Sequence, residues 1–457
     1  MRLYTFLVAS FVTFSLADTP PLPTAWKSKA PGNKVSAGLD DWWTVFNDPE
    51  LNKLIAEAKA SFPGMKAVIA RVDQARAAVR MARSALLPNI MATGDLGRSR
   101  ASDTVYDFSF GTLTNYGAAA QLSYEVDLWG RVRDQVNAAK ADAESENANV
   151  YAVGLILSGE VARVYYAMRS IDEEKDVLDK TLKLRHEALK LATARVEAGA
   201  TNELDRVRAE AELATTEAEL AALAGPRAEL ENTLAVTLGK VASGYKVAPA
   251  KLPASLPPVP KLLPSELLQR RPDIVSATRR IDAARLRVGA TETSYFPKVS
   301  LGAGYGTQTS HATKFLDGDS QIWNVGLRLS IPIFVGGQRK AAVDAARAVL
   351  AEATGLFEEK LLIAFKEVES LMSRLEAQQK QAESQTRLQT AADAAAKLAR
   401  QRYTEGVATY LEVIEAERTS LSARRSLVQL RGQRLLTTVQ LIQALGGGWN
   451  QSPTPKP

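Results

Sequence analysis

The chain has 457 residues, of which 46% are hydrophobic and 24% charged, an ordinary composition for a folded protein. Its 57 Lys and Arg exceed its 51 Asp and Glu by only six charges, and they form no basic run, which argues against nucleic-acid binding. The absence of Cys and the presence of only two His exclude thiol catalysis, disulfide frameworks and Cys/His metal sites.

The N-terminal segment predicts secretion. Residues 1–17 have the form of a signal peptide, because Arg2 precedes a mostly apolar run that ends in the small-x-small pattern Ser15-Leu16-Ala17. Residues 18–48 contain Pro and Lys without periodicity and predict an extended arm. No later apolar stretch reaches the roughly 18 residues of a membrane-spanning helix. If the mature chain is a membrane protein, it must therefore cross the bilayer as strands.

Helical pattern begins at Asp48-Pro49, where Asp48 is expected to cap the helix and Pro49 to occupy its first turn. The pattern continues to Leu87 with a break at Pro63-Gly64, and Pro88 ends it. The period then changes to two, which is typical of strands with two unlike faces. Two strands of roughly 10 residues or more are predicted, long enough to cross a bilayer at a tilt. They cover about 89–98 and 115–128.

A very long helix is predicted after Gly130. Residues 131–197 contain no Pro, so this helix approaches about 100 Å at 1.5 Å per residue. Gly199 is expected to end it in a left-handed conformation, and a second helix returns to complete a hairpin over about 131–238. Helices of this length must pack against one another like a coiled coil.

The second half of the chain follows the same plan. Residues 241–264 hold six Pro and predict an extended connector. A helix over about 265–294 comes next. The remaining predicted elements are two strands over about 298–308 and 321–334, a helical hairpin over about 338–445 with Gly406 at its turn, and a flexible tail over 447–457.

Four landmarks occur twice in the same order, each 206 to 209 residues apart. They are Ala85-Leu86-Leu87-Pro88 with Ser294-Tyr295-Phe296-Pro297, Leu128-Trp129-Gly130 with Phe334-Val335-Gly336, Arg195 to Gly199 with Arg402 to Gly406, and Thr237-Leu238-Gly239 with Ala444-Leu445-Gly446. The chain is therefore interpreted as a tandem duplication, with one repeat at 49–240 and another at 265–446. A duplicated unit without a catalytic centre indicates a symmetric structural body before it indicates an enzyme.

Four strands per chain cannot close a barrel, and a bilayer does not tolerate open sheet edges. Either the strands form a soluble sheet or several chains pool them. Pooling suits a secreted chain with amphipathic strands, and three chains would supply about twelve strands, within the range of outer-membrane barrels. The residues favour pooling without fixing the number at three.

Several motifs together resemble the TolC-like outer-membrane efflux proteins, in particular the OprM-like branch that serves resistance-nodulation-division (RND) pumps. The resemblance covers about residues 40–446. The motifs are Asp41-Trp42-Trp43 with Phe46-Asn47-Asp48-Pro49-Glu50-Leu51, Leu267-Leu268-Gln269-Arg270-Arg271-Pro272-Asp273-Ile274, Phe296-Pro297, Ile331-Pro332-Ile333-Phe334 with Gly336-Gly337, and Tyr403 through Arg418.

This resemblance implies an α+β membrane protein without enzymatic activity or cofactor. It implies a homotrimer whose twelve-stranded barrel lies in the lipid of a Gram-negative outer membrane and continues as a long α-helical periplasmic tunnel. Such a trimer is the exit duct of a tripartite efflux system and docks to a periplasmic adaptor and an inner-membrane RND pump. Many OprM-like proteins carry a lipidated Cys after the signal peptide. Here Asp18 follows Ala17 and the sequence holds no Cys, so attachment through the barrel alone is expected.

The family places acidic residues just past the second hairpin tip, where they narrow the periplasmic mouth, and Glu412 and Glu415 match those positions. Rings of such carboxylates would govern opening and ion selectivity. Arg418, one turn beyond, could pair with Glu415 and hold the closed form. Asp205 belongs to the same candidate gate, because it lies at the matching place in the first hairpin.

Simpler interpretations remain open for these acids. Thr409-Tyr410-Leu411-Glu412 has the form of a capping box, so Glu412 could serve only to cap its helix. Glu415 could be an ordinary solvated helix residue, although it aligns with Arg208 of the first repeat and inherits no capping role.

Two further groups of residues are candidates. The hairpin tips, as adaptor contacts, are Gly199, Thr201, Gly406 and Val407. The joints between strands and helices are Pro88, Gly130, Pro297, Pro332, Gly336 and Gly337, where Gly permits a sharp turn and Pro a bend.

Other functions are alternatives. A channel for type I protein secretion is the main alternative to RND efflux. A periplasmic adaptor or a coiled-coil scaffold would also have long helical hairpins, but adaptors are not expected to have four duplicated amphipathic strands. An enzyme is disfavoured, because the sequence has no nucleophile–base–acid set, phosphate loop or metal motif.

Overall fold

The structure is a computed structural model that describes residues 23, 25–27, 41–100, 102, 104, 111–253, 255–257 and 264–447. The predicted signal peptide at 1–17 lies outside the described residues, as do most of the arm at 18–48 and nearly all of the tail at 447–457. The sheet consists of β1 (Asn89–Arg100), β2 (Thr112–Val126), β3 (Lys298–Thr309) and β4 (Gln321–Ser330). The helices of at least ten residues are α1 (Pro49–Ser61), α2 (Pro63–Ser84), α3 (Arg131–Glu197), α4 (Glu203–Ala222), α5 (Ala224–Thr237), α7 (Pro272–Glu292), α8 (Gln338–Thr404) and α9 (Tyr410–Ala444).

The chain forms two compact units, and neither is one of the predicted repeats. The first unit contains residues 1–62, 154–271 and 358–457, and the second contains 63–153 and 272–357. Each unit therefore takes segments from both halves of the sequence. No helix in the described part of the chain is long and apolar enough to span a membrane.

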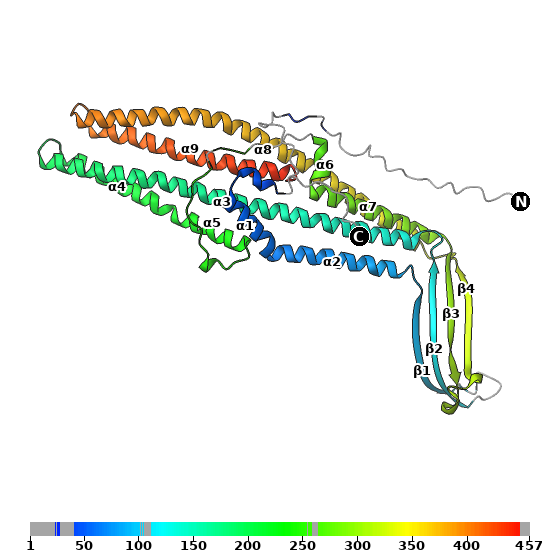
Figure 1. The fold of residues 1–457 in the computed structure, drawn as a ribbon. Helices are drawn as coiled ribbons and strands as arrows, with labels where there is room; N and C mark the ends of the chain where they lie inside the picture. The colour runs from blue at the N-terminus through cyan, green and yellow to red at the C-terminus, as the bar shows by residue number, and fades with distance from the viewer. Residues whose placement is uncertain are drawn as a thin grey trace. The chain divides into compact units, whose positions relative to one another are not determined.

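The second unit is built around one antiparallel sheet with the strand order β1-β2-β3-β4 (Figure 1). The central pair joins the two halves of the chain, because β2 from the first pairs with β3 from the second over eleven residues from Tyr116↔Thr309 to Val126↔Val299. In the described part of the chain, β1 and β4 each have one neighbouring strand and are the edges.

The joints between strands and helices use backbone conformations that favour glycine. Gly130 has φ 82°, and Gly336 and Gly337 have φ 56° and 84°. Before α3, the Asp127 carboxylate accepts hydrogen bonds from the backbone N–H groups of Val132 at 3.0 Å and Arg133 at 2.9 Å. Burial alone would raise the pKa of Asp127, but these bonds and the Arg133 guanidinium lower it, so the helix start is capped by an ionised carboxylate.

A second contact connects the joints of the two repeats. The indole Nε1 of Trp129 donates to the carbonyl of Pro297 at 2.7 Å, and the Trp129 ring stacks on Phe296 with centroids 5.0 Å apart. Because Phe296-Pro297 precedes β3 and Trp129 follows β2, this contact fixes the ends of the two paired strands to each other.

Three predicted elements are shortened or interrupted near a proline. Strand β4 ends at Ser330 rather than about 334, since Pro332 cannot donate to a strand ladder. The return helix of the first hairpin divides into α4 and α5 at Leu223, because Pro226 cannot bond to the carbonyl four residues back. The helix predicted over 265–294 similarly divides before Pro272, leaving the short α6 (Leu267–Arg270) and α7.

The N-terminal end of the first unit is fixed to α3 by buried aromatic and polar contacts. Trp42, Trp43 and Phe46 are buried, and the Trp42 indole donates to the Ser158 hydroxyl at 3.1 Å. The Asp48 carboxylate caps α1 by accepting from the backbone N–H groups of the first turn. It also accepts from the Tyr165 hydroxyl at 3.1 Å.

A cation completes this junction. Arg169 forms an ion pair with Asp48 at 3.1 Å, and its guanidinium lies 4.3 Å from the centre of the Tyr165 ring. Burial raises the pKa of Tyr165 well above its usual value, so this hydroxyl remains a donor at any physiological pH.

We expect Asp48→Ala to destabilise the first unit by about 3 kcal/mol, since it removes a helix cap and leaves Arg169 as a half-buried cation without its partner. Thermal unfolding of the detergent-solubilised protein, followed by circular dichroism, measures the loss. Asp73→Ala is the matched control, because the Asp73–Arg76 pair is exposed and 3.6 Å long. Equal unfolding midpoints for the two variants would contradict the role given to Asp48.

Candidate functional site

The two hairpin tips have the same backbone geometry. At the end of α3, Ala200 N–H donates to the Arg195 carbonyl at 2.8 Å and Gly199 N–H to the Val196 carbonyl at 2.9 Å. At the end of α8, the Val407 N–H donates to the Arg402 carbonyl and the Gly406 N–H to the Tyr403 carbonyl, at the same sequence separations as in the first tip. This is a Schellman motif, which needs a left-handed residue. Gly199 with φ 68° and Gly406 with φ 79° confirm the predicted left-handed turns.

An apolar cluster packs the helices together behind the tips. It contains Ala192 of α3, Ala209 of α4, Tyr403 of α8 and Tyr410, Val413 and Ile414 of α9. The two tyrosine rings are 5.3 Å apart, and Arg195 lies over Tyr403 at 4.6 Å while donating to its carbonyl at 2.8 Å. Burial, together with the nearby Glu417 charge, raises the pKa of Tyr410 to about 12. The cluster thus connects the first hairpin to the second.

A buried charge network lies next to this cluster and joins four helices. Arg185 of α3, with its side chain 2% exposed, donates to Glu417 of α9 at 2.5 Å and pairs with Glu212 of α4 at 3.1 Å. The two carboxylates are 9% and 5% exposed.

Each carboxylate has a second cation on its outer side. Arg400 of α8 pairs with Glu417 at 2.5 Å, and Arg418 of α9 donates to Glu212 at 2.8 Å. Three guanidinium groups therefore surround two carboxylates. A buried carboxylate is costly without a partner. The Arg185–Glu417 and Arg418–Glu212 pairs cross between the hairpins and keep them in register. We name Arg185, Glu212, Arg400, Glu417 and Arg418 the inter-hairpin charge network.

The predicted gate residues are not all brought together. Glu412 accepts from the Thr409 backbone N–H at 3.2 Å in a complete capping box, so the helix-capping interpretation is confirmed for it. Arg402 also lies 3.6 Å from its carboxylate. Glu415 is exposed and forms no ion pair with any described residue. Asp205 accepts from the Thr201 hydroxyl within its own hairpin.

The predicted pairing of Arg418 with Glu415 is wrong. Arg418 pairs instead with Glu212 on the first hairpin, and this hydrogen bond is the main cause of the raised pKa of Arg418. The physical reason is burial: Glu212 has only its cations as partners, whereas Glu415 is solvated. Arg418 therefore connects the two hairpins rather than stabilising a turn within one.

Arg185, Glu212, Arg400 and Glu417 were not among the residues predicted from sequence, although a signal for them exists. Tyr410, Val413, Ile414 and Glu417 follow a helical period on the buried face of α9. A charged residue on such a face requires a buried partner. Arg185 likewise lies on a buried face of α3, together with Leu178 and Ala192.

Comparison with known proteins identifies the family. The family model described as "Outer membrane efflux protein" matches residues 54–240 and again 263–447. The chain belongs to this family. It is an OprM-like outer-membrane channel of RND-type efflux, a class that contains no enzymes.

Individual relatives agree with this assignment over nearly the full chain. The channel is 28% identical over 442 residues to outer membrane protein OprJ of Pseudomonas aeruginosa, which covers 94% of this chain and 91% of OprJ. It is 30% identical to the pyoverdine export outer membrane protein OpmQ of the same species, covering 93% and 91%. The solved structure of the outer-membrane channel OprN superposes with a TM-score of 0.87 at 28% identity, covering 94% of this chain and 98% of OprN.

We expect Arg185→Met to destabilise the channel by about 3 kcal/mol, because two buried carboxylates lose their shared partner. Combining it with Glu212→Gln and Glu417→Gln should recover most of the loss, since no buried charge is then left uncompensated. Urea unfolding in detergent measures both. Arg206→Met is the matched control, because Arg206 also pairs with two glutamates but on an exposed helix face. A loss from Arg185→Met no greater than from the control would refute the network.

Proposed function

We propose that three copies of the channel assemble around one axis, so that twelve strands cross the outer membrane and six helical hairpins line a periplasmic passage. One observation carries this proposal: the sheet of each chain has two edge strands, β1 on one side and β4 on the other. Inside lipid their free N–H and C=O groups have no water to bind, so an open edge is not viable. Pairing β4 of one copy with β1 of the next removes every edge.

The two faces of the sheet support this arrangement. Register places Ile90, Leu122, Ala303 and Val325 in one row across the strands, and Tyr124, Leu301 and Leu327 in another row on the same face. The opposite face has rows such as Ser123, Gly302 and Gly326. Lipid would contact the apolar face, and the polar face with its glycines would leave a wide aqueous lumen.

The proposed tandem duplication accounts for the six helical hairpins of the trimer. All four ends of the hairpin helices, at Gly199, Gly239, Gly406 and Gly446, have a left-handed glycine after the last turn. The family model also matches the chain twice. Two similar hairpins per chain would give the trimer near-sixfold helical walls.

In the proposed gate, the hairpin tips close the passage by coming together around the axis. Three copies of Glu415 would form a ring of exposed carboxylates, which repel one another and attract cations. Glu412 would add a second ring in addition to its capping role. Opening would separate the hairpins of one chain and require Arg418 to leave Glu212 and Glu417 to leave Arg185.

Partner binding is proposed at the tips themselves. Gly199, Gly406 and Val407 are exposed there, and Thr201 is half-buried. A periplasmic adaptor that packs against these turns would connect the channel to an inner-membrane RND pump. The 457 residues contain no Cys that could carry an acyl chain, so the proposal assigns their membrane attachment to the strands.

We expect Glu415→Gln to raise single-channel conductance and reduce cation preference, because it removes three like charges from the passage without affecting a helix cap. Planar-bilayer recordings in a KCl gradient measure both quantities. Glu376→Gln is the control, since Glu376 is already paired with Lys380 at 3.0 Å on an exposed part of α8. Currents from Glu415→Gln identical to those of the wild type would remove Glu415 from the gate.

The adaptor contact can be tested in a background that has no native thiol. A maleimide-based photo-cross-linker on Val407→Cys, 62% exposed at the tip, should capture the co-expressed adaptor. The same reagent on Val241→Cys, 80% exposed after α5, should not. Equal capture from both positions, identified by mass spectrometry, would show that docking is not specific to the tips.

A further inference from the structure

We propose that the polar face of the sheet carries a binding site for an anionic group of a passing solute, built from Lys298, Ser300 and Arg328 where β3 and β4 meet the helices. The inference rests on the proposed function in one respect, namely that this face lines the passage. It adds a ligand chemistry that is independent of the gate at the hairpin tips.

Strand register brings the three residues together. Ser300 of β3 pairs with Arg328 of β4 on one side and with Glu125 of β2 on the other. Lys298 lies two residues before Ser300 on the same strand and therefore on the same face. Adjacent positions on one face are about 5 Å apart across strands and about 7 Å apart along a strand. A single phosphate or carboxylate could therefore contact all three side chains.

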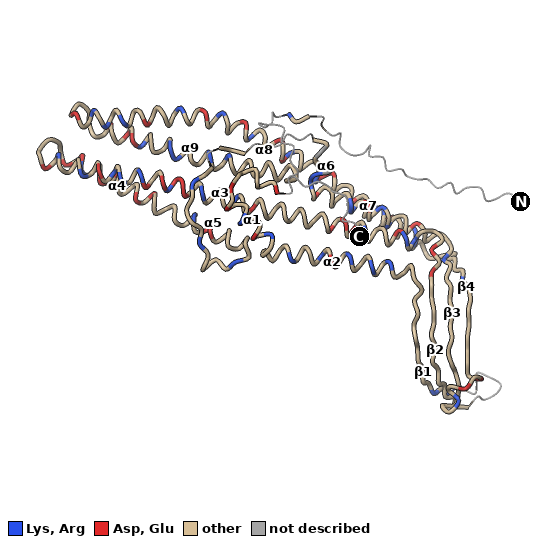
Figure 2. Tube along the Cα trace, in the orientation of Figure 1, with Lys and Arg blue, Asp and Glu red and all other residues tan. Residues whose placement is uncertain are grey.

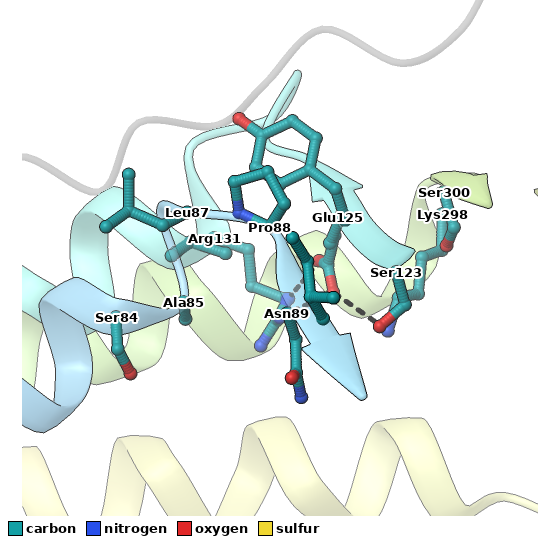
Figure 3. Close-up of a pocket in the computed structure, with 13 residues that line it drawn as sticks. Ser84, Ala85, Leu87, Pro88, Asn89, Ser123, Glu125, Arg131, Lys298 and Ser300 are labelled. Atoms are coloured by element: carbon teal, nitrogen blue, oxygen red, sulfur yellow. Dashed lines mark hydrogen bonds and ion pairs between the residues drawn. The ribbon is translucent and has the colours of Figure 1, made fainter. Parts of the chain in front are cut away.

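The charges at this place do not balance. The Glu125 carboxylate accepts from Arg131 through two hydrogen bonds of 2.8 Å and pairs with Lys298 at 2.8 Å (Figure 3). One carboxylate therefore serves two cations. Arg328 is exposed and forms no ion pair with any residue that the structure describes. The group of Glu125, Arg131, Lys298 and Arg328 carries two positive charges in excess.

The surroundings add polar groups and space. A cavity of about 650 Å³ adjoins Ser300 and Lys298 on the β2 side of the site, away from Arg328, and its lining includes Asn89 and Ser123. Figure 3 shows these side chains around the Glu125 carboxylate. In the next row of the sheet, Gly302 and Gly326 have no side chains. A solute could therefore approach the cations over a low backbone surface.

The donors define the class of ligand. The guanidinium fork of Arg328 fits two oxygens of a carboxylate, phosphate or sulfate, and the Lys298 ammonium and Ser300 hydroxyl supply further donors. Because Lys298 also pairs with Glu125 and the site is open, the anionic group should bind weakly. Weak binding suits a conduit, where a solute must enter the site and also leave it.

The first test measures protection of Arg328 in the purified full-length channel. Phenylglyoxal modifies exposed arginines, and peptide mass spectrometry follows the rate at each one. Inorganic phosphate is the probe, with potassium chloride at equal ionic strength as the reference. At twice its dissociation constant, phosphate should slow modification of Arg328 about threefold, since the rate falls as 1 + [L]/Kd. Arg98 of β1, on the opposite face, is the internal control and should react at one rate throughout.

A second variant separates the site from general charge effects. Lys298→Gln should abolish most of the phosphate protection, while Lys314→Gln in the β3–β4 connection should leave it intact. Unchanged reactivity of Arg328 in phosphate, or equal protection of Arg98, would overturn the proposal. The readout needs no ionic current, so failure of the channel proposal in bilayers and failure of this site give different results.

A lipid headgroup could present the same chemistry, and nanodiscs distinguish the two sources. In phosphatidylcholine nanodiscs, added phosphate should still protect Arg328. Protection that appears without added phosphate, and only in nanodiscs containing phosphatidylglycerol, would assign the site to the membrane surface and overturn the solute site.

Discussion

The proposed assembly depends on one constraint: strands that cross a lipid bilayer cannot leave backbone N–H and C=O groups unpaired. A chain with two edge strands cannot satisfy this condition alone, so in the proposed assembly other copies supply the missing neighbours. The pairing of β2 with β3 brings the two halves of the sequence together in the sheet, and each half continues into a long helix. In the proposed trimer, assembly and the closed lumen follow from this requirement.

The hairpins are joined by ion pairs as well as by apolar contacts. Figure 2 shows charges of both signs along the helices of the first unit. Besides the apolar cluster and Arg185, cations of α9 join the hairpins: Arg425 pairs with Glu174 at 2.8 Å and Arg431 with Glu173 at 2.6 Å. Arg418 extends the series toward the tips. In the proposed gate, these pairs would separate when the hairpins of one chain part.

Periodicity and the positions of glycine predict most of the fold. The 67-residue helices α3 and α8 have the predicted limits, because Gly130, Gly199 and Gly406 mark turns whose conformation the sequence dictates. The break at Leu223 is not among the predicted helix ends, although the position of Pro226 indicates it. The partner of Arg418 could not be predicted, because a single helix does not reveal which neighbour covers it. Exposed Glu415 gives no structural signal, and only the family resemblance makes it a candidate.

Disulfide cross-linking between sheet edges tests the central claim most directly. Met91→Cys in β1 would be combined in turn with Ile322→Cys, Asn324→Cys and Gly326→Cys in β4, all on the polar face. Within one chain these strands are three spacings, about 14 Å, apart, too far for a disulfide. We predict that at least one pair gives covalent dimers and trimers on oxidation, and nothing larger. Monomers from every pair, or a series extending past three chains, would contradict closure of the sheet by three copies.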